Sequence, residues 1–408
     1  MRNRPKFAVL GAGHGGRAMA VYLATIGFDV NLYNRTPENI QNIKQAGGIF
    51  LTFAADLEDH LFPMDTEVAE IRQKREYSLL PETDRLIEED LKYIFAKIKT
   101  ISSDIEEVMK DRDVIMVVVP ASGHRYVAEK CAPYLRDGQA VLLNPGRCFG
   151  AIEFCKIIND YYKDEETPDI TIAEAQTFIY VCRRTKPLNV RVFAVKESVN
   201  IAAIPSKKIT NVLNLVKDIY PQFTPQENVL KTSLGNLSCV FHVPTMILNV
   251  ARIDRKRDFR YYMEGITKHT ASIVEDVDKE RLAIAEAMGV RAISARKWLH
   301  QTYGSEGADL YEAIQNTRAY RQIQCPRSIN HRYIWEDVPT GLVPLSSLGK
   351  KLGVPTPMID SFIHLATSIF KKGFNIDFLE KGRTMEKLGL DRMSTDEIKK
   401  FVETGYEN

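Results

Sequence analysis

The sequence predicts an α/β protein in which an N-terminal Rossmann-type domain, built on a doubly wound parallel sheet, precedes a mainly α-helical C-terminal domain. Three observations predict this. A strand, a glycine-rich turn and a helix follow one another at the N-terminus, within "KFAVLGAGHGGRAMAVYLATIG". Continuous apolar strands then alternate with helices. After about Thr232 the strand signals become few.

Composition limits the class of protein. A chain of 408 residues is long for one core and sufficient for two domains. Its 55 basic and 53 acidic residues leave a formal charge of +2, which argues against a nucleic-acid or membrane partner. No apolar run approaches the roughly 18 residues of a membrane span. The six cysteines form no CxxC pair and have no metal-ligand spacing, so we expect reduced thiols, no bound metal and a cytoplasmic location.

The predicted elements of the first domain follow in order. After "KFAVLGAG", small and apolar residues recur at helical spacing up to Gly27, and "FDVNLYN" alternates as a strand does, which completes a βαβ unit. Residues 55–97 predict a charged helical excursion with a turn at Pro81. Further strands are expected in "DVIMVVVPA", "AVLLNPGR", "DITIAEA", "NVRVFAVKE" and "VNIAAIP". We place this dinucleotide-binding domain at residues 1–228.

The second predicted domain, residues 229–408, is all-helical. The stretch "MEGITKHTASIVEDVDKERLAIAEAMG" predicts a long helix that ends at Gly289, and "TPMIDSFIHLATSIF" predicts another with Pro357 in its first turn.

A dinucleotide site is predicted at the first glycine-rich turn. Gly11, Gly13 and Gly16 form G-x-G-x-x-G between a strand and a helix. Gly11 permits the tight turn, Gly13 lets the backbone approach a pyrophosphate, and Gly16 allows close helix–strand packing. The whole turn is predicted to bind the cofactor: Gly11, Ala12, Gly13, His14, Gly15 and Gly16.

The end of the second strand favours NADP(H). An Asp or Glu usually binds the ribose hydroxyl of NAD there. This chain has Asn34, Arg35 and Thr36 instead, and Arg35 could pair with a 2′-phosphate. If Arg35 only stacks on the adenine, NAD(H) stays usable. Turns that end two later strands add Pro120, Ala121 and Pro145 as cofactor neighbours.

The apolar stretch "LGNLSCVFHVPTMILN" carries one histidine, His242. A single histidine on an apolar helix is more often a core residue with satisfied hydrogen bonds than a functional group. The stretch alone does not decide between the two.

Several segments together give a family resemblance. With the Rossmann-type half, "EAQTFIYVCR", "LGNLSCVFHVPTMILN", "YYMEGIT", "HRYIWEDVPTGLVPLSSLGKKLGVPTPMIDSFI" and "KGRTMEKLGLDRMSTDEI" make the chain similar to the octopine/nopaline (opine) dehydrogenases over nearly its whole length. N-x-x-x-x-x-H-x-P and R-x-x-x-x-D-V-P are the most specific pieces. The 55–97 excursion is longer than this family leads us to expect.

The resemblance implies a reaction and three site residues. These enzymes use NAD(P)H to reduce the imine formed from an amino-acid amine and a 2-oxo acid. Their catalytic histidine corresponds to His242, its partner aspartate to Asp337, and a substrate-binding arginine to Arg332. The residue types suit the chemistry, because an imidazole moves protons near neutral pH, a carboxylate fixes its tautomer and a guanidinium holds a carboxylate. Asn236, Gln176 and Tyr262 are further candidates for substrate contact.

Alternatives stay open. A two-domain 2-hydroxyacid or 3-hydroxyacid dehydrogenase would use a lysine, for which Lys268 and Lys279 are available in less specific surroundings. A protein that senses NADP(H) without turnover is the other class. Arg332 could instead form a surface salt bridge with Glu336. Pyruvate is the first guess for the oxo acid, by resemblance. The amino acid, the direction of the reaction and a homodimeric state are left open.

Overall fold

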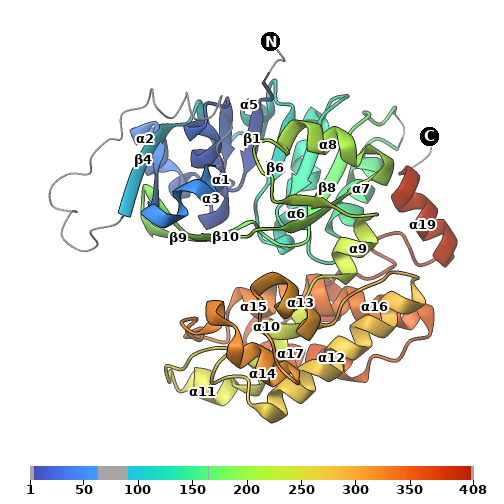
Figure 1. The fold of residues 1–408 in the computed structure, drawn as a ribbon. Coiled ribbons are helices and arrows are strands. Elements are labelled where there is room, and N and C mark those ends of the chain that lie inside the picture. The colour runs from blue at the N-terminus through green and yellow to red at the C-terminus, as the bar shows by residue number, and fades with distance from the viewer. Residues whose placement is uncertain (1–3, 63–90, 164, 406–408) are drawn as a thin grey trace. The chain divides into compact units, whose positions relative to one another are not determined.

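The computed structural model describes residues 4–62, 91–163 and 165–405, which form two compact units (Figure 1). The first unit runs to Pro145 and resumes over Ile157–Pro225. The second comprises Gly146–Lys156 and Gln226–Gly405. The sequence predicted a single boundary near residue 228. In the structure, the short segment Gly146–Lys156 already belongs to the second unit. The chain then returns to the first unit and leaves it finally after Pro225.

The first unit is built on an eight-stranded sheet with the order β12-β11-β8-β7-β6-β1-β2-β5. Every neighbouring pair is parallel except β11 with β8. The strands β1, β6 and β7 are buried along their whole length, as the continuous apolar runs predicted. Strand β2 is also buried along its whole length, although its sequence alternates. Their bounds are β1 Phe7–Leu10, β2 Val30–Tyr33, β5 Thr100–Ser102, β6 Val114–Val117, β7 Ala140–Leu143, β8 Thr171–Ala175, β11 Val199–Ile204 and β12 Phe223–Pro225.

Helix α1 packs against strands of this sheet and of a second, smaller one. It spans His14–Thr25, and every residue from Gly16 to Thr25 is buried, which explains why small and apolar side chains dominate it. The other helices of this unit are α2 Gln41–Ala46, α3 Glu58–Leu61, α5 Ile105–Met109, α6 His124–Cys131 and α8 Ile209–Val216. Helix α7, Gly150–Tyr161, begins in the segment Gly146–Lys156 of the second unit and ends in the first.

The second sheet corrects the end of the helical excursion predicted at 55–97, whose described beginning contains the short helix α3, Glu58–Leu61. Residues Leu91–Lys97 form strand β4, which pairs antiparallel with β3, Gly48–Ala54. The two join β10, Asn189–Val195, and β9, Tyr180–Lys186, in the order β4-β3-β10-β9. Ile94 and Ala96 alternate with more exposed neighbours and are buried, so the segment has the period of a strand. The expected turn at Pro81 lies outside the described residues.

The second unit is helical, as predicted, apart from one antiparallel backbone pair between Arg260 and Gln324. The long predicted helix is α12, Lys268–Ala287, which Thr267 caps and which ends just before Gly289 at φ +74°. Pro357 opens the other, α17, Pro357–Phe374. The remaining helices are α9 Val229–Leu234, α10 Ser238–Leu248, α11 Val250–Asp254, α13 Ala295–Tyr303, α14 Leu310–Asn316, α15 Arg332–Trp335, α16 Val343–Leu352, α18 Phe378–Lys381 and α19 Thr395–Thr404.

Within the described ranges, none of the helices combines the length and the apolar character that crossing a membrane would need.

Candidate functional site

The predicted cofactor residues gather at one edge of the large sheet. Strands β1, β2, β6, β7 and β8 run parallel, so their carboxyl ends share an edge, where open α/β sheets bind ligands. The residues that follow these ends are Gly11, Asn34, Pro120, Pro145 and Gln176. The structure therefore brings together segments that are up to 165 positions apart in the sequence, the difference between 176 and 11.

The glycine turn has the geometry that a dinucleotide requires. Gly11 has φ +118°, and a Cβ added there would lie 2.4 Å from the Val118 carbonyl oxygen. A Cβ at Gly16 would lie 1.6 Å from the Gly11 carbonyl oxygen, so only glycine lets α1 start this close to β1. A Cβ at Gly13 would meet nothing within 4 Å. Open space beside the start of a helix suits the backbone approach of a pyrophosphate.

Asn34, Arg35 and Thr36 form the adjoining end of β2. The Asn34 Oδ1 accepts a hydrogen bond from the Ala12 amide at 3.1 Å, and its Nδ2 donates to the Thr36 carbonyl at 2.9 Å. Arg35 is exposed, and its guanidinium carbon lies 5.1 Å from the centre of the Tyr126 ring. Tyr126 was not among the predicted site residues. The side chain at the position of the usual carboxylate is therefore a neutral amide that braces the glycine turn.

Two other predicted residues of this edge hold neighbouring segments. The His14 Nδ1 accepts a hydrogen bond from the Arg184 amide at 2.6 Å, which attaches the glycine turn to β9. The Gln176 Oε1 accepts one from the Asn200 side-chain amide at 2.7 Å. Ala121 is buried and begins a 3-10 turn directly after Pro120. The two hydrogen bonds connect this edge of the sheet to β9 and to β11.

The second cluster lies in the helical unit, around His242. Helix α10 begins at Ser238, whose amide donates to the Asn236 Oδ1 at 3.0 Å. His242 lies one turn further, and its Nδ1 is 2.6 Å from the Asp337 Oδ2. Its other nitrogen, Nε2, is 3.1 Å from the Tyr262 hydroxyl. Asp337 and Tyr262 lie 95 and 20 residues from His242 in the sequence, and both contact its imidazole. All three residues were candidates in the sequence analysis.

The local fold explains why Asp337 reaches this position. The short helix α15 begins at Arg332, where the His331 side chain caps it, and Asp337 precedes a π-helical turn over Val338–Leu342. Gly341 in that turn packs on α10 so closely that a Cβ there would lie 2.5 Å from the Cys239 Cβ. A glycine at this point lets the aspartate turn approach the helix that carries His242.

Burial governs the electrostatics of the pair. The Asp337 side chain is 1% exposed and that of His242 is 13% exposed. Burial lowers the pKa of His242 below its ordinary value, and the charge and hydrogen bond of Asp337 counteract only part of that effect. The imidazole is therefore neutral at neutral pH. The short contact with Asp337 favours the tautomer with the proton on Nδ1, which leaves Nε2 able to accept one.

Aromatic rings surround the imidazole. The Tyr333 ring stacks on it with centres 3.8 Å apart and planes 17° apart. The Tyr261 hydroxyl donates to the backbone carbonyl of His242 at 2.8 Å, and the Tyr262 ring stacks on that of Tyr320 at 4.1 Å. Sequence reasoning missed Tyr333, although it directly follows Arg332 in the recognised motif. These rings fix the orientation of His242 and raise the cost of charging it.

Arg332 and Asn236 have contacts of their own. The Arg332 guanidinium pairs with Glu336 at 3.3 Å, the contact that the sequence offered as the alternative, yet its side chain is still 51% exposed. Asn236 is buried, and its Nδ2 lies 3.6 Å from the Cys148 Sγ. Arg332 thus keeps an accessible face beside the His242 cluster, whereas the Asn236 amide is engaged at the start of α10.

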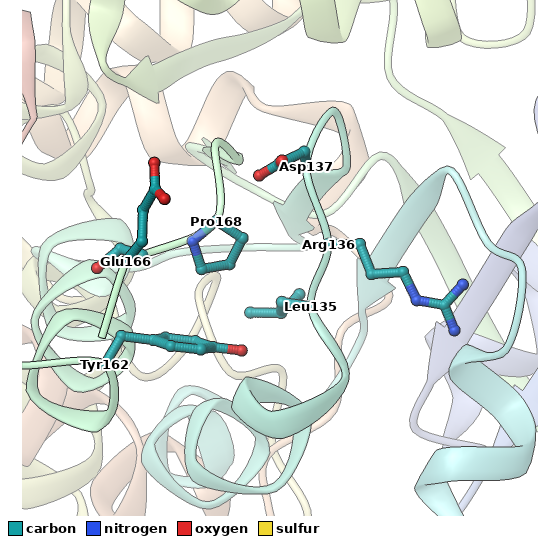
Figure 2. A pocket seen from close by; sticks show the side chains of 7 residues that line it. Leu135, Arg136, Asp137, Tyr162, Glu166 and Pro168 are labelled. Atoms are coloured by element: carbon teal, nitrogen blue, oxygen red, sulfur yellow. The ribbon is translucent and has the colours of Figure 1, made fainter. Parts of the chain in front are cut away.

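Figure 2 shows a separate pocket of the first unit, and its lining includes none of the predicted cofactor residues. It is lined by Leu135, Arg136, Asp137, Tyr162, Glu166, Thr167 and Pro168. These residues precede β7 and β8, so they lie toward the amino ends of the strands, opposite the carboxyl edge. The Asp137 carboxylate accepts from the Asp169 amide at 2.7 Å, and the Tyr162 hydroxyl donates to the Ala132 carbonyl at 2.6 Å. Their polar groups connect loops, and we assign no chemistry to them.

Two protein-family models match the chain, one over most of each unit. Residues 225–370 match the model described as "NAD/NADP octopine/nopaline dehydrogenase, alpha-helical domain". Residues 6–144 match the NAD binding domain of 6-phosphogluconate dehydrogenase. The two matches contain the His242 cluster and the glycine turn, respectively.

Individual relatives agree with these matches. The chain is 38% identical to an opine dehydrogenase of Arthrobacter sp. (strain 1C), over 97% of this chain and 98% of that protein. Structures of octopine dehydrogenase with NADH and L-arginine or with NADH and pyruvate are 18% identical, superpose with a TM-score of 0.74 and cover 99% of both chains. A yersinopine dehydrogenase with NADP⁺ bound is 14% identical, with a TM-score of 0.74 and 97% and 100% coverage.

Proposed function

The chain belongs to the opine dehydrogenase family of NAD(P)-dependent oxidoreductases that act on CH–NH donors, and from this premise we propose that it joins the amine of an amino acid to a 2-oxo acid. The first candidate for the oxo acid is pyruvate. The product of this reaction is a secondary amine dicarboxylate. When the reaction runs in the opposite direction, as an oxidation, the same compound is the substrate. The observation that carries the proposal is the 2.6 Å contact between His242 and Asp337, which leaves Nε2 for proton transfer.

His242 is assigned the proton transfers at Nε2. Condensation moves two protons from the ammonium nitrogen to the carbonyl oxygen, which departs as water and leaves an iminium ion. A neutral imidazole accepts each proton in turn from the nitrogen and returns it to the oxygen. Asp337 holds the Nδ1 proton and stabilises the imidazolium in between. The nicotinamide supplies the hydride when the cofactor is bound, so the residues of the helical unit orient substrates and move protons.

Arg332 and Tyr262 are assigned to substrate binding. The exposed side of the Arg332 guanidinium can hold the carboxylate of the oxo acid, while Glu336 fixes its other side at 3.3 Å. The Tyr262 hydroxyl, 3.1 Å from Nε2, lies where it can contact a polar atom of the reacting substrate. Burial raises the pKa of Tyr262 well above its ordinary value, so this hydroxyl keeps its proton and can donate a hydrogen bond.

We assign the cofactor to the carboxyl edge of the large sheet, with NADP(H) preferred. Support for the preference comes from Arg35, which is exposed beside Tyr126, and from the neutral Asn34 in the usual carboxylate position. A guanidinium at this place attracts a 2′-phosphate, and an amide does not repel it. We place the protein in the cytoplasm, where its six cysteines, none of which forms a disulfide, stay reduced.

The test is cofactor oxidation with paired substrates. The purified protein receives NADPH with pyruvate, 2-oxoglutarate or oxaloacetate, each with every standard amino acid and each without an amine. Loss of the nicotinamide absorbance that requires both an amine and an oxo acid is the expected result and names the substrates. Oxidation with an oxo acid alone would identify a hydroxyacid dehydrogenase instead. Tight NADPH binding without any turnover would favour a sensing protein.

A further inference from the structure

A short segment, Gly146–Lys156, enters the helical unit with an unusual backbone. Arg147 has φ +62° and Phe149 has φ +61°, a left-handed region that side-chain-bearing residues rarely adopt. The surroundings hold this conformation in place. The buried Arg383 donates to the carbonyls of Gly146 at 3.1 Å and Cys148 at 3.0 Å. Strained residues of this kind persist where neighbouring contacts determine them and often mark function.

The conformation delivers the Arg147 side chain to the His242 cluster. Arg147 is 6% exposed. Its Nε lies 3.2 Å from the Glu336 Oε1, and one terminal nitrogen lies 3.6 Å from the Asp337 Oδ1 and donates to the Ser238 hydroxyl. Ser238 is the first residue of α10, the helix that carries His242. One guanidinium therefore contacts both the helix of the histidine and the aspartate that faces it.

Charges alternate through this cluster. Arg332 faces Glu336, Glu336 faces Arg147, Arg147 faces Asp337, and Asp337 faces His242. Glu336 and Asp337 are neighbours in the sequence and are both buried, with side chains 4% and 1% exposed. Two adjacent buried carboxylates repel each other unless a cation lies between or against them. Arg147 is the buried cation that lies against both of them.

We propose that Arg147 is a positioning residue that places a fixed positive charge beside Asp337 and keeps the Asp337 carboxylate directed at the Nδ1 of His242. The proposal rests on the proposed function, in which His242 transfers protons. Asp337 uses Oδ2 for the imidazole, and within the described residues its Oδ1 makes no hydrogen bond. The Arg147 nitrogen at 3.6 Å from that oxygen therefore acts through charge, and its link to Ser238 fixes where the charge stands.

The electrostatics agree in direction. Burial alone would lower the pKa of Arg147, but the charges of Glu336 and Asp337 raise it by more, so the guanidinium stays charged. The positive charge of Arg147 in turn lowers the pKa of His242. The other titratable or charged groups that act on the pair come from the surrounding elements: Arg332 and Glu336 beside Asp337, Cys239 on α10, and Tyr261, Tyr262 and Tyr333 around the imidazole.

The test is an NMR titration of the histidine ring carbons in the full-length protein. A His242→Asn variant identifies its signal among the eight histidines. Arg147→Gln removes the cation, so His242 should take up its proton at a pH higher by at least about one unit. Arg147→Lys keeps the charge and should restore most of that midpoint. In the substrate assay, Arg147→Gln should lower kcat at least about tenfold with less change in KM.

Arg281→Gln is the matched control. Arg281 is another fully buried arginine of the helical unit, paired with Asp278 at 2.6 Å, and it contacts neither His242 nor Asp337. This variant should lose stability without moving the midpoint. A folded Arg147→Gln protein with an unchanged midpoint would overturn the proposal.

If Arg147→Gln does not fold, Glu336→Gln decides. Glu336→Gln removes the other carboxylate that faces Arg147, so the positive charge of Arg147 acts mainly on Asp337 and His242. The pH midpoint of the His242 titration should then fall. A midpoint that stays the same or rises overturns the proposal. Because the titration needs no turnover, an inactive protein with the expected midpoints would refute the proposed function and leave the role of Arg147 standing.

Discussion

The glycine turn of the first unit and the His242 cluster of the second are built on opposite principles. The turn is made of consecutive residues, and the binding that we propose for it depends on backbone atoms and on unoccupied space. A Cβ at Gly16 would have no room, and a Cβ at Gly13 would meet no atom within 4 Å. The cluster is made of side chains from positions 147, 242, 262 and 337, which are linked by an ion pair and by hydrogen bonds. A backbone site follows from a local motif, whereas a side-chain site depends on how distant segments pack.

The largest expected effect is a loss of turnover that leaves cofactor binding unchanged, which would show that the two sites act independently. His242→Ala removes the group that we propose transfers protons, and it should lower turnover by at least about two orders of magnitude while NADPH affinity stays the same. Steady-state kinetics and fluorescence titration with NADPH measure the two quantities. His364→Ala, an exposed histidine on α17, is the control and should keep its turnover. Near-normal turnover of His242→Ala would remove this histidine from the mechanism.

The reverse separation is expected at Gly13. The added methyl of Gly13→Ala meets no protein atom within 4 Å, so the fold should be unaffected. It occupies the space that we assign to the pyrophosphate, and NADPH should bind at least about tenfold more weakly, a change of about 1.4 kcal/mol. Gly373→Ala adds a methyl that also meets nothing, in the helical unit, and should leave the affinity unchanged. Equal affinities for the two variants would place the cofactor elsewhere.

The pH dependence tests the helical unit alone. In the proposed opine oxidation, His242 accepts a proton, so its neutral form is expected to be the active one. Burial holds its pKa below the ordinary value of about 6.5. The rate of oxidation should therefore stay constant as pH falls to that value and drop about tenfold per unit only below the lowered pKa.

Asp337→Asn sharpens the pH test. The charge of Asp337 raises the pKa of His242, so its removal should move the transition to still lower pH and reduce kcat. A transition that moves upward in this variant would contradict the assignment. The kcat/KM profile for opine oxidation, recorded over the acid range, checks both expectations.

The smallest expected effect is at Arg35, which is exposed and therefore screened by solvent. Arg35→Ala should weaken NADPH by about fivefold and leave NADH nearly unchanged. Dissociation constants for both nucleotides, measured at low and at moderate salt, give the comparison. Arg125→Ala, on the neighbouring helix α6 and paired with Glu129, is a control for the general loss of one positive charge. Equal losses for NADPH and NADH would refute a role at the 2′-phosphate.

Sequence patterns with a local cause were predicted well. The glycine turn, the apolar strands and the helices α12 and α17 follow from spacing, capping and the conformational needs of glycine and proline. The residues His242 and Asp337 came from a resemblance, because no periodicity indicates that two side chains 95 residues apart will meet.

Features with a long-range cause were missed. The small sheet joins strands near residues 48–97 to strands near 180–195, and the charged character of Lys92 and Lys97 hid the alternation in β4. Arg147 follows the predicted strand in "LLNPGR", so it was assigned to the dinucleotide domain. Only the left-handed backbone at Arg147 and Phe149 and the pairing with Glu336 reveal that it belongs with the helices.

The segment Gly146–Lys156 also determines how this chain can be divided. A fragment that starts at Gln226 would contain every helix from α9 onward but would lack Arg147 and Glu153. Asp337 would lose its facing guanidinium, and the buried Arg383 would lose its carboxylate partner at 2.7 Å. Removal of one member of a buried ion pair is strongly destabilising. The helical half is therefore not an independent module, and its exchange between relatives requires eleven residues from the middle of the other half, 146 to 156.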